Sequence, residues 1–232
     1  TTLYGVDLYG EKSLHKLLDA LNEIPGLFWI RIMYCYPEEI YEELIDAIAR
    51  NEKVCHYLDL PIQHANDTML KRMGRRTSNA DLVRIITHLR ERIPDITLRT
   101  TLICGFPGET EEDFEDSLRM TEEADFLKVH AFRYSKREGT AAYEMKNQID
   151  GETKNKRVNR LMEKAEKVTR RFFESSAGEV RTVLFEQEGS LISGYTENYI
   201  KVYADGGEEH LNSFQKVKLL EPYKDGMKGE IL

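Results

Sequence analysis

The sequence predicts an α/β protein in which a partial parallel β/α barrel is followed by a small all-β barrel. Up to about residue 150, short apolar runs alternate with longer stretches of helical period, which is typical of successive strand–helix units. One long amphipathic segment follows. After Ala177–Gly178 the chain changes to short apolar runs separated by Gly, Asn and Asp, which is typical of β-structure. We therefore expect three parts: residues 1–150, a connecting helix at 151–176, and a β-barrel at 177–232.

Apolar periodicity places the elements of the first part. Helices are expected where apolar residues recur every three or four positions, and strands where a short apolar run lies between turn residues. The expected helices cover residues 13–22, 37–48, 67–73, 79–92 and a segment from 110, and the expected strands cover residues 28–33, 57–63, 96–103 and 127–134.

Residues that favour helix starts support three of these helices. Pro37 suits a first helical position, and two glutamates follow it near the positive end of the helix dipole. Either Ser78 or Asn79 can cap the helix at 79–92. Thr110 offers a capping hydroxyl and is followed by three carboxylates at 111–113.

The second half of the chain predicts a helix and then strands. Residues 152–173 have one apolar face and many Lys and Arg on the other, so this helix should lie across the outside of the barrel. The expected strands of the β-barrel cover residues 180–185, 191–195, 199–203 and 215–220.

Composition limits the class of protein. The 232 residues are 41% apolar, enough for a real core, and no apolar run approaches the roughly 20 residues that span a bilayer. We expect a soluble, cytoplasmic protein without a membrane partner. The formal net charge of −8 argues against a globally basic nucleic-acid binder, although a local basic groove remains compatible with it.

The three cysteines predict neither a disulfide framework nor a metal motif. Cys35, Cys55 and Cys104 are an odd number, widely spaced, in a chain without secretory features. We expect them to be small buried apolar residues at strand ends or helix edges.

Ligands of parallel β/α folds meet the loops after the strands, so those loops supply the candidate site residues. The turn Gly105–Glu109 is the most informative, because its two glycines let the backbone approach a flat ligand and the next helix offers unpaired N–H groups. Such a turn is also common as a plain strand-to-helix connection. Gln63, Tyr36 and Tyr134 follow other strands, and Arg99 points from within one.

Two further features allow two readings each. His64 is either a general base at a strand end or an ordinary hydrogen-bonded loop residue. The basic run 71–76 either grips a phosphate or is a solvated helix end. No Ser-His-Asp order, metal-ligand spacing or Walker loop is present, and we assign no catalytic residue.

Four strings resemble the radical S-adenosylmethionine (SAM) methylthiotransferases. They are Tyr4–Gly10 (YGVDLYG), Tyr34–Ile40 (YCYPEEI), Leu60–His64 with Leu70–Arg75 (LPIQH, LKRMGR), and Arg99–Phe114 (RTTLICGFPGETEEDF). The resemblance covers essentially the whole chain. The first three strings most resemble members that modify an aspartate of a small-subunit ribosomal protein. From about residue 129, Val129–Thr140 and Gly194–Val202 are more similar to members that modify threonylcarbamoyladenosine in tRNA.

The resemblance implies a radical SAM barrel, a TRAM-like β-barrel that recruits substrate, and two [4Fe–4S] clusters supplied with electrons by a reductant. One cluster would reduce SAM to a radical that abstracts a substrate hydrogen, and the auxiliary cluster would deliver sulfur. The six cluster cysteines of the family do not occur in this sequence, so no metal ligand is assigned. We expect a truncated, assembled or chimeric chain that is inactive alone.

The resemblance and the strand-end positions together assign the candidate site residues. The residues expected to support SAM are Gln63, Arg99, Gly105, Phe106, Pro107, Gly108 and Glu109, and those expected to contact substrate are Tyr36, His64, Tyr134 and Lys201.

Three classes of function remain at this point. The first is a methylthiotransferase acting on a ribosomal protein, or alternatively on tRNA. The others are a β/α-barrel enzyme of unrelated chemistry and a binding module without catalysis. Residues 177–232 carry ten acidic and six basic residues, a net charge of −4, which favours a basic ribosomal protein over an RNA backbone. Lys201, Lys216 and Lys218 would reverse that preference if they gathered on one face.

Overall fold

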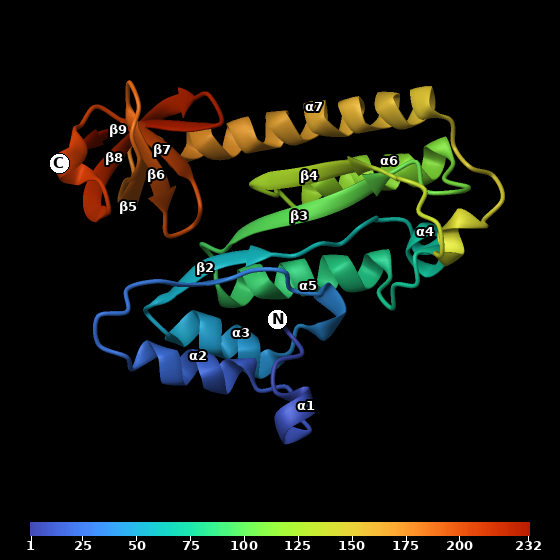
Figure 1. The fold of residues 1–232 in the computed structure, drawn as a ribbon, viewed down its shortest axis with the longest axis horizontal. Helices are drawn as coiled ribbons and strands as arrows, with labels where there is room; N and C mark the ends of the chain where they lie inside the picture. Colours follow the sequence, from blue (N-terminus) through green and yellow to red (C-terminus); the bar gives the residue numbers. More distant parts are fainter.

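The computed structural model describes residues 1–232 and contains one parallel sheet and one closed β-barrel. The four strands of the sheet lie in the order β1-β2-β3-β4, so each strand pairs with its neighbour in sequence (Figure 1). Their bounds are β1 Ile30–Ile32, β2 Val54–Asp59, β3 Thr97–Cys104 and β4 Lys128–Arg133. Strand β1 lies at an edge of the sheet.

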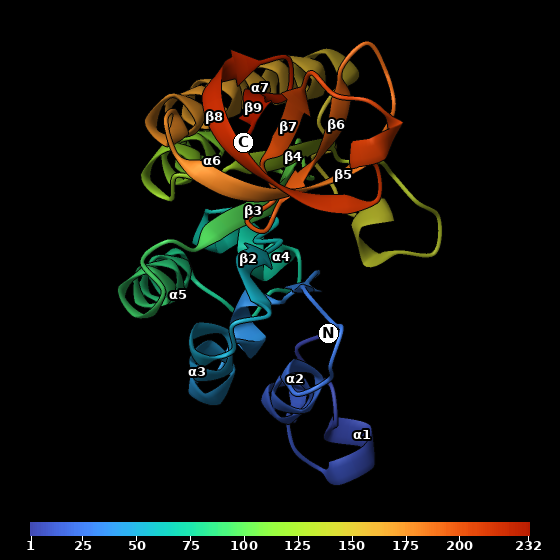
Figure 2. The same cartoon turned by 90° about the vertical axis from the view of Figure 1, so that its left-hand side faces the viewer.

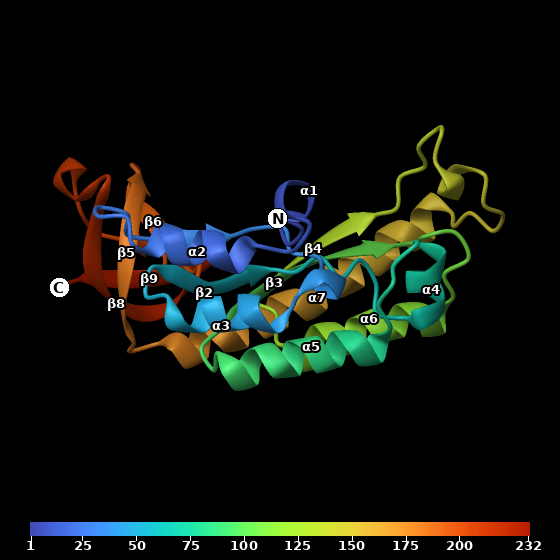
Figure 3. The ribbon, with the colours of Figure 1, turned by 90° about the horizontal axis from the view of Figure 1, so that it is seen from below.

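Two helices precede β1, and the helices between the strands cover one face of the sheet (Figures 2 and 3). They are α1 Val6–Tyr9, α2 Leu14–Asn22, α3 Glu42–Arg50, α4 Asp67–Arg72, α5 Asn79–Arg92 and α6 Glu111–Glu123, with a 3₁₀ turn at Pro37–Glu39. The core between sheet and helices contains 28 buried apolar residues. Along β3, Leu98, Leu102 and Cys104 are buried in this core, while Arg99 and Thr101 alternate onto the opposite, inner face.

Helix α7, Gly151–Ser176, continues the helical layer beside β4 and α6 and leads to the β-barrel. The barrel strands are β5 Val180–Gln187, β6 Ile192–Thr196, β7 Lys201–Ala204, β8 Ser213–Tyr223 and β9 Gly226–Ile231. They close in the order β5-β6-β7-β9-β8 around a core of 11 buried apolar residues. Two of these 11, Leu127 and Phe173, lie outside the barrel strands. Short 3₁₀ turns lie at Ala141–Tyr143 and Glu208–His210.

The β-barrel lies at the end of the sheet where the strands begin. Figures 1 and 3 show it at one end of α7, while the loops that follow β3 and β4 lie at the other end. Arg31 of β1 joins the two parts, because its guanidinium donates to the backbone carbonyls of Thr196 and Glu197 at 2.9 and 3.2 Å. No helix is both long and apolar enough to cross a lipid bilayer.

The structure corrects several expected element bounds. The helix expected at 37–48 is divided, because Ile40 and Tyr41 are extended and α3 begins only at Glu42. The strand expected at 57–63 begins at Val54 and ends at Asp59, two residues before Pro61, which has no N–H for the ladder. Strand β9 and the short helix α1 were not expected.

Candidate functional site

The loops that follow β2, β3 and β4 meet where these strands end, on the side of the sheet farthest from the β-barrel (Figure 3). This region is called the strand-end edge below. Gln63 follows β2 and remains attached to β3. Its N–H donates to the carbonyl of Thr101, and its own carbonyl accepts from the N–H of Ile103, both at 2.9 Å. Gln63 has a φ of 70°, uncommon for a residue with a side chain. The structure thus brings Gln63, the Gly105–Glu109 turn and Tyr134 to one edge.

A buried carboxylate organises the turn. Glu109 is 3% exposed, and one of its oxygens, Oε2, accepts from the N–H of Gly105 at 2.7 Å and from Nη1 of Arg157 at 2.5 Å. Its other oxygen, Oε1, lies 3.0 Å from Nε2 of His64. Arg157 belongs to α7, so the connecting helix is tied directly to the turn.

His64 is fully buried and has a defined tautomer. Its Nδ1 accepts from the backbone N–H groups of the next two residues, both at 3.0 Å, so Nε2 carries the proton that is donated to Glu109. The structure therefore places His64 behind the turn, in contact with Glu109, and not on an exposed surface.

Two cationic side chains cover the backbone of the turn. Gly105 has a φ of 73°, and a Cβ at this position would lie 2.3 Å from Cγ of Lys154. Gly108 has a φ of 79°, and a Cβ there would lie 2.3 Å from Nη1 of Arg72. Pro107 between them is buried and fixes its own φ. An anionic group that approaches this backbone would meet Lys154 and Arg72.

An aromatic pair lies beside the turn. The ring of Phe106, which is 6% exposed, meets the ring of Tyr134 edge-on, with centroids 5.2 Å apart. Nζ of Lys154 lies 5.1 Å from the centroid of Tyr134. The Tyr134 hydroxyl is buried without a hydrogen-bond partner, which is uncommon in a folded protein. This orphaned polar atom suits a site that a polar ligand completes.

Arg99 lies on the inner face, between this edge and the β-barrel. Its Nε and Nη2 donate to the two oxygens of the buried Asp59 at 3.1 and 3.0 Å. Burial acts to lower the pKa of Arg99, but the hydrogen bonds to Asp59 outweigh it and raise that pKa. The guanidinium also lies 5.9 Å from the ring centroid of Tyr199, which comes from the β-barrel.

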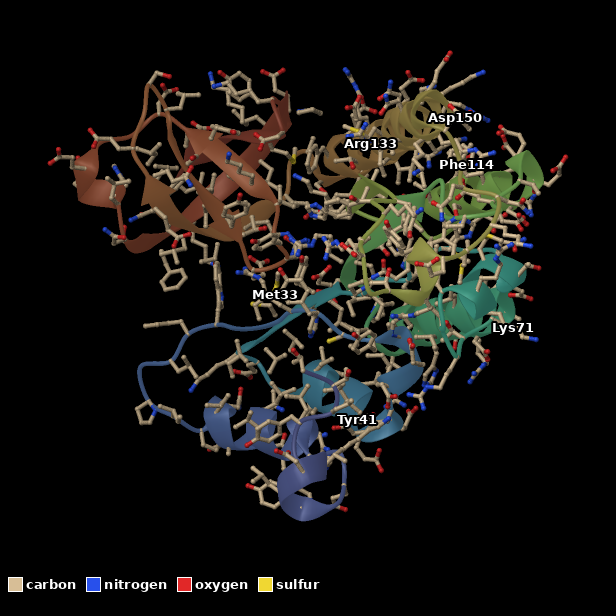
Figure 4. All side chains as sticks on the ribbon, turned by 45° about the vertical axis from the view of Figure 1, so that its right-hand side comes forward. Met33, Tyr41, Lys71, Phe114, Arg133 and Asp150 are labelled. Atoms are coloured by element: carbon tan, nitrogen blue, oxygen red, sulfur yellow. The ribbon has the colours of Figure 1, made fainter.

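Tyr36 and the basic run 71–76 lie beside each other. Arg75 lies over the ring of Tyr36 at 4.9 Å, and Arg75 and Arg76 form ion pairs with the two glutamates at 38–39. Lys71 points away from the molecule at the end opposite the β-barrel (Figure 4). Because Arg75 and Arg76 are already paired with carboxylates, the run does not form a phosphate site in which all four cations are available.

Lys201 is separated from the other candidate residues. It belongs to β7 in the β-barrel, where its Nζ lies 3.4 Å from a carboxylate oxygen of Asp225 and 5.0 Å from the ring centroid of Tyr203. The interaction with Tyr203 raises the pKa of Lys201. Lys201 therefore belongs to a second location, at the opposite end of the sheet.

The cysteines do not fit an iron–sulfur cluster. All three are free and buried, as the sequence predicted, and no group of three or more His, Cys, Asp or Glu side chains is placed to hold a metal. Burial raises the pKa of the Cys35 and Cys104 thiols to about 12 in each case. Cluster ligands must converge on one point, whereas Cys35 follows β1, Cys55 belongs to β2 and Cys104 ends β3.

Sequence reasoning missed three residues that build the site. Arg157 and Lys154 belong to an amphipathic helix whose many cations look alike in sequence, and only the fold shows which of them reach the turn. Asp59, the partner of Arg99, resembles any polar residue at a strand end. An acidic residue directly before a buried Leu-Pro-Ile run was the available signal, because a buried carboxylate needs a cation.

Comparison with known proteins identifies the family of this chain. The model of the family described as "Radical SAM superfamily" matches residues 2–121. The ribosomal protein uS12 methylthiotransferase RimO of Lachnoclostridium phytofermentans is 53% identical over 192 residues, which are 83% of this chain and 43% of that protein. RimO of Alkaliphilus oremlandii is 42% identical over 228 residues, 97% of this chain and 52% of that protein.

The fold also has a likeness among solved structures. Coproporphyrinogen III oxidase (HemN) from Escherichia coli, described as a radical SAM enzyme, superposes with a TM-score of 0.53 and 15% identity over 90% of this chain and 50% of that chain. At this identity the likeness concerns the fold alone. The chain spans about half the length of the two RimO proteins. It belongs to the radical SAM superfamily and, within it, is closely related to the RimO proteins.

Proposed function

We propose that this chain is part of an enzyme that adds a methylthio group to ribosomal protein uS12. The observation that carries the proposal is the identity of 42–53% to proteins named as uS12 methylthiotransferases, which extends over 83–97% of this chain. The match to RimO of Alkaliphilus oremlandii covers 97% of this chain, so it includes both the turn Gly105–Glu109 and the β-barrel.

The edge formed by Gln63, the Gly105–Glu109 turn and Tyr134 is the region we assign to SAM. A glycine-containing backbone covered by cationic side chains suits the carboxylate of an amino-acid moiety, and the orphaned Tyr134 hydroxyl offers a hydrogen bond to it. When bound in such enzymes, SAM supplies the radical chemistry, while the protein orients the reactants and excludes water. Arg99 lies on the inner face of the sheet, farther from the strand ends, and we assign it to the support of SAM from that face.

His64 and Arg157 act as positioning residues in this proposal. They fix both oxygens of Glu109, and Glu109 in turn holds the N–H of Gly105. These contacts support the turn from the side of the core. Tyr36, on the loop after β1, is our candidate for contact with the substrate, whereas we assign Tyr134 to SAM because its buried hydroxyl lies beside the turn.

Charge favours a protein substrate. The segment 177–232 has a net charge of −4, and a basic ribosomal protein gains from an acidic recruiting surface, whereas an RNA backbone does not. Lys216 and Lys218 belong to β8 and Lys201 to β7, and β9 lies between those strands, so the three lysines do not follow one another on neighbouring strands. We propose uS12 as the substrate and keep tRNA as a test arm.

A chimera tests the proposal. The segment of Alkaliphilus oremlandii RimO that aligns with this chain is replaced by residues 1–232, and the chimera is purified and reconstituted anaerobically with iron and sulfide. It is offered uS12 and threonylcarbamoyladenosine-containing tRNA separately, with SAM and a reductant. Mass spectrometry should find one methylthio group on uS12 and none on the tRNA.

The unmodified RimO protein is the positive control, and the chimera with Gly105→Val is the matched negative control. Transfer to tRNA alone would overturn the substrate, and SAM cleavage without transfer to either would overturn the reaction. A chimera that binds its clusters and SAM but does not cleave SAM would argue against the assigned site.

A further inference from the structure

A surface rich in exposed tyrosines lies around α1, beside the edge of the sheet formed by β1. The chain has 12 tyrosines, and all four that are exposed belong to this surface: Tyr4, Tyr9, Tyr34 and Tyr36. Aliphatic side chains of α1, Val6 and Leu8, are exposed as well. Residues 3–9 together with Tyr34 and Tyr36 are called the tyrosine surface below. Figures 1 and 2 show α1 on the side of the molecule opposite α7, away from the contact between the sheet and the β-barrel.

The fold holds this surface in place, although α1 has only four residues. A helix of this length is not stable alone, and here two glycines with positive φ bound it. The N–H of Ser13, at the start of α2, donates to the carbonyl of Tyr4 at 2.7 Å and closes the segment into a loop. Before α1, Oγ1 of Thr1 donates to the carbonyl of Met33 at 2.8 Å. The exposed side chains are thus presented on an ordered backbone, which lowers the entropic cost of binding a partner.

The two tyrosines after β1 flank a residue that is fully buried. The N–H of Cys35 donates to the carbonyl of Asp59 at 2.8 Å, while its neighbours Tyr34 and Tyr36 are 67% and 49% exposed. Tyr34 also has a φ of 58°, which is uncommon for a residue with a side chain. Because β1 and β2 are parallel, the loop after β1 leaves the sheet on the same side as the strand-end edge. The tyrosine surface therefore reaches the side of the sheet to which we assign SAM.

The charge around the tyrosine surface is negative. Residues 1–40 contain six Asp or Glu and three Lys or Arg, a net charge of −3. Two of the three cations, Lys12 and Lys16, are paired with glutamates, and the third, Arg31, donates to carbonyls of the β-barrel. Asp7, by contrast, is exposed on α1 and forms no ion pair. Tyrosine rings and a free carboxylate without a free cation suit the side chains of Lys and Arg.

We propose that the tyrosine surface docks a segment of the ribosomal protein substrate that contains Lys or Arg, an inference that rests on the proposed function. The basic side chains would lie over the tyrosine rings and near Asp7, and apolar residues of the same segment would cover Val6 and Leu8. RNA would be repelled by the net negative charge and would find no free cation. A second copy of this chain would bring two surfaces of the same negative charge together.

Fluorescence anisotropy with labelled uS12 and residues 1–232 tests the docking. Tyr4→Ser combined with Tyr9→Ser should weaken binding about tenfold, whereas Phe at both positions should preserve it, because a cation over a ring needs no hydroxyl. Acetylation of the lysines of uS12 should also weaken binding about tenfold. Val6→Ser should weaken binding about threefold. Val83→Ser is its matched control and should have no effect, since both valines are 44% exposed on a helix and Val83 belongs to α5.

The two serine substitutions are then made in the RimO chimera, where the KM for uS12 should rise about tenfold. Four results would overturn the proposal: unchanged affinity of the tyrosine variant, equal effects of Val6→Ser and Val83→Ser, unchanged binding of acetylated uS12, or an unchanged KM in the chimera. Self-association of residues 1–232 that the serine substitutions abolish would assign the surface to a second copy instead. A chimera that transfers no methylthio group to uS12 would contradict the proposed function, while the binding of uS12 to residues 1–232 would still decide whether this surface docks it.

Discussion

At the scale of single residues, the site depends on one carboxylate that accepts hydrogen bonds from three donors. Glu109 receives hydrogen bonds from His64, from the backbone of Gly105 and from Arg157. A buried carboxylate that lost one of these partners would keep its desolvation cost, so the three donors are energetically linked. These contacts fix the side of the turn that faces the core, while Lys154 and Arg72 cover its other side.

The first prediction concerns Gly105. Gly105→Ala should destabilise the protein, because a residue with a Cβ is strained by about 1–2 kcal/mol at positive φ and would also press on the Lys154 side chain. Gly74→Ala is the control, since Gly74 has a similar φ of 74° and no atom within 4 Å of its added Cβ. Urea denaturation should show a larger loss at Gly105 than at Gly74, and Lys154→Ala should remove the difference. Equal losses at the two glycines would refute the contact.

The second prediction concerns pH and His130. Burial lowers the pKa of His130 below its ordinary value of 6.5, so below pH 6.5 the unfolded chain binds a proton that the folded chain resists. His130 therefore makes stability fall as the pH drops from 6.5 toward the folded pKa. His130→Gln should flatten the free energy of unfolding between pH 7 and pH 5, as measured by urea denaturation at each pH. A slope unchanged from the parent protein would contradict the assignment.

At the scale of elements, helix α7 is the link between the turn and the β-barrel. Arg157, near its start, pairs with Glu109, and Thr169, further along, donates to the carbonyl of Leu127 at 2.6 Å. The helix packs against β4 and α6 along this length. Its orientation therefore depends on contacts at both ends of the sheet.

The third prediction tests that link. Arg157→Met should cost about 3–5 kcal/mol, because it leaves the Glu109 carboxylate buried without its cation. Glu109→Gln in the same chain should recover part of this loss, so the double variant should be more stable than the sum of the single variants implies. Arg119→Met, on the exposed surface of α6, is the control. Additive losses from Arg157→Met and Glu109→Gln would show that the two side chains do not interact.

Local chemistry predicted some elements well and others poorly. Ser78 and Thr110 form complete capping boxes with Asp81 and Asp113, and the helices that follow begin where the sequence placed them. Strand β9 was missed because its glycines read as turn residues. The structure needs them for close packing: a Cβ on Gly226 would lie 2.1 Å from the carbonyl oxygen of Lys201.

In the candidate site, too, some features could be predicted from the sequence and others could not. The strand-end loops were predictable because parallel strands end together, and the turn Gly105–Glu109 lies where that rule placed it. The partners of the site were not predictable, since Arg157 lies 48 residues from Glu109 and the pairing depends on how α7 crosses the sheet. Long-range pairing of charges is set by tertiary packing and leaves no periodic pattern in the sequence.

At the scale of the whole molecule, the fourth prediction concerns how the β-barrel is attached to the sheet. Arg31 donates to the carbonyls of Thr196, the last residue of β6, and Glu197, and it lies 4.6 Å from the ring centroid of Tyr199. Arg31→Met should weaken this attachment by about 1.5–3 kcal/mol for each hydrogen bond to the charged group. The only tryptophan, Trp29, reports on the interface because its ring meets Phe214 of β8 at 4.8 Å.

In Arg31→Met, the change in Trp29 fluorescence should therefore precede the loss of helical circular dichroism during urea denaturation. In the parent protein the two signals should change together. Arg84→Met, which removes an exposed arginine on α5, should leave them coincident. Coincident signals in Arg31→Met would show that Arg31 does not control the attachment.

The last prediction concerns iron and the molecule as a whole. After anaerobic reconstitution with iron and sulfide, residues 1–232 should not hold a [4Fe–4S] cluster in stoichiometric yield. Cys35, Cys55 and Cys104 are buried on separate segments, and burial raises the pKa of two of these thiols to about 12, so forming three thiolates at one point would require the core to open. Iron analysis and visible absorption measure the yield, and the reconstituted RimO chimera is the positive control. Alkylation of the thiols gives a second test of their burial. In the native protein the three cysteines should react slowly with the alkylating reagent, and in denaturant all three should react. A stoichiometric cluster, or 5′-deoxyadenosine formed from SAM by this chain alone, would contradict the prediction. Either result would mean that the buried cysteines can move together and bind iron.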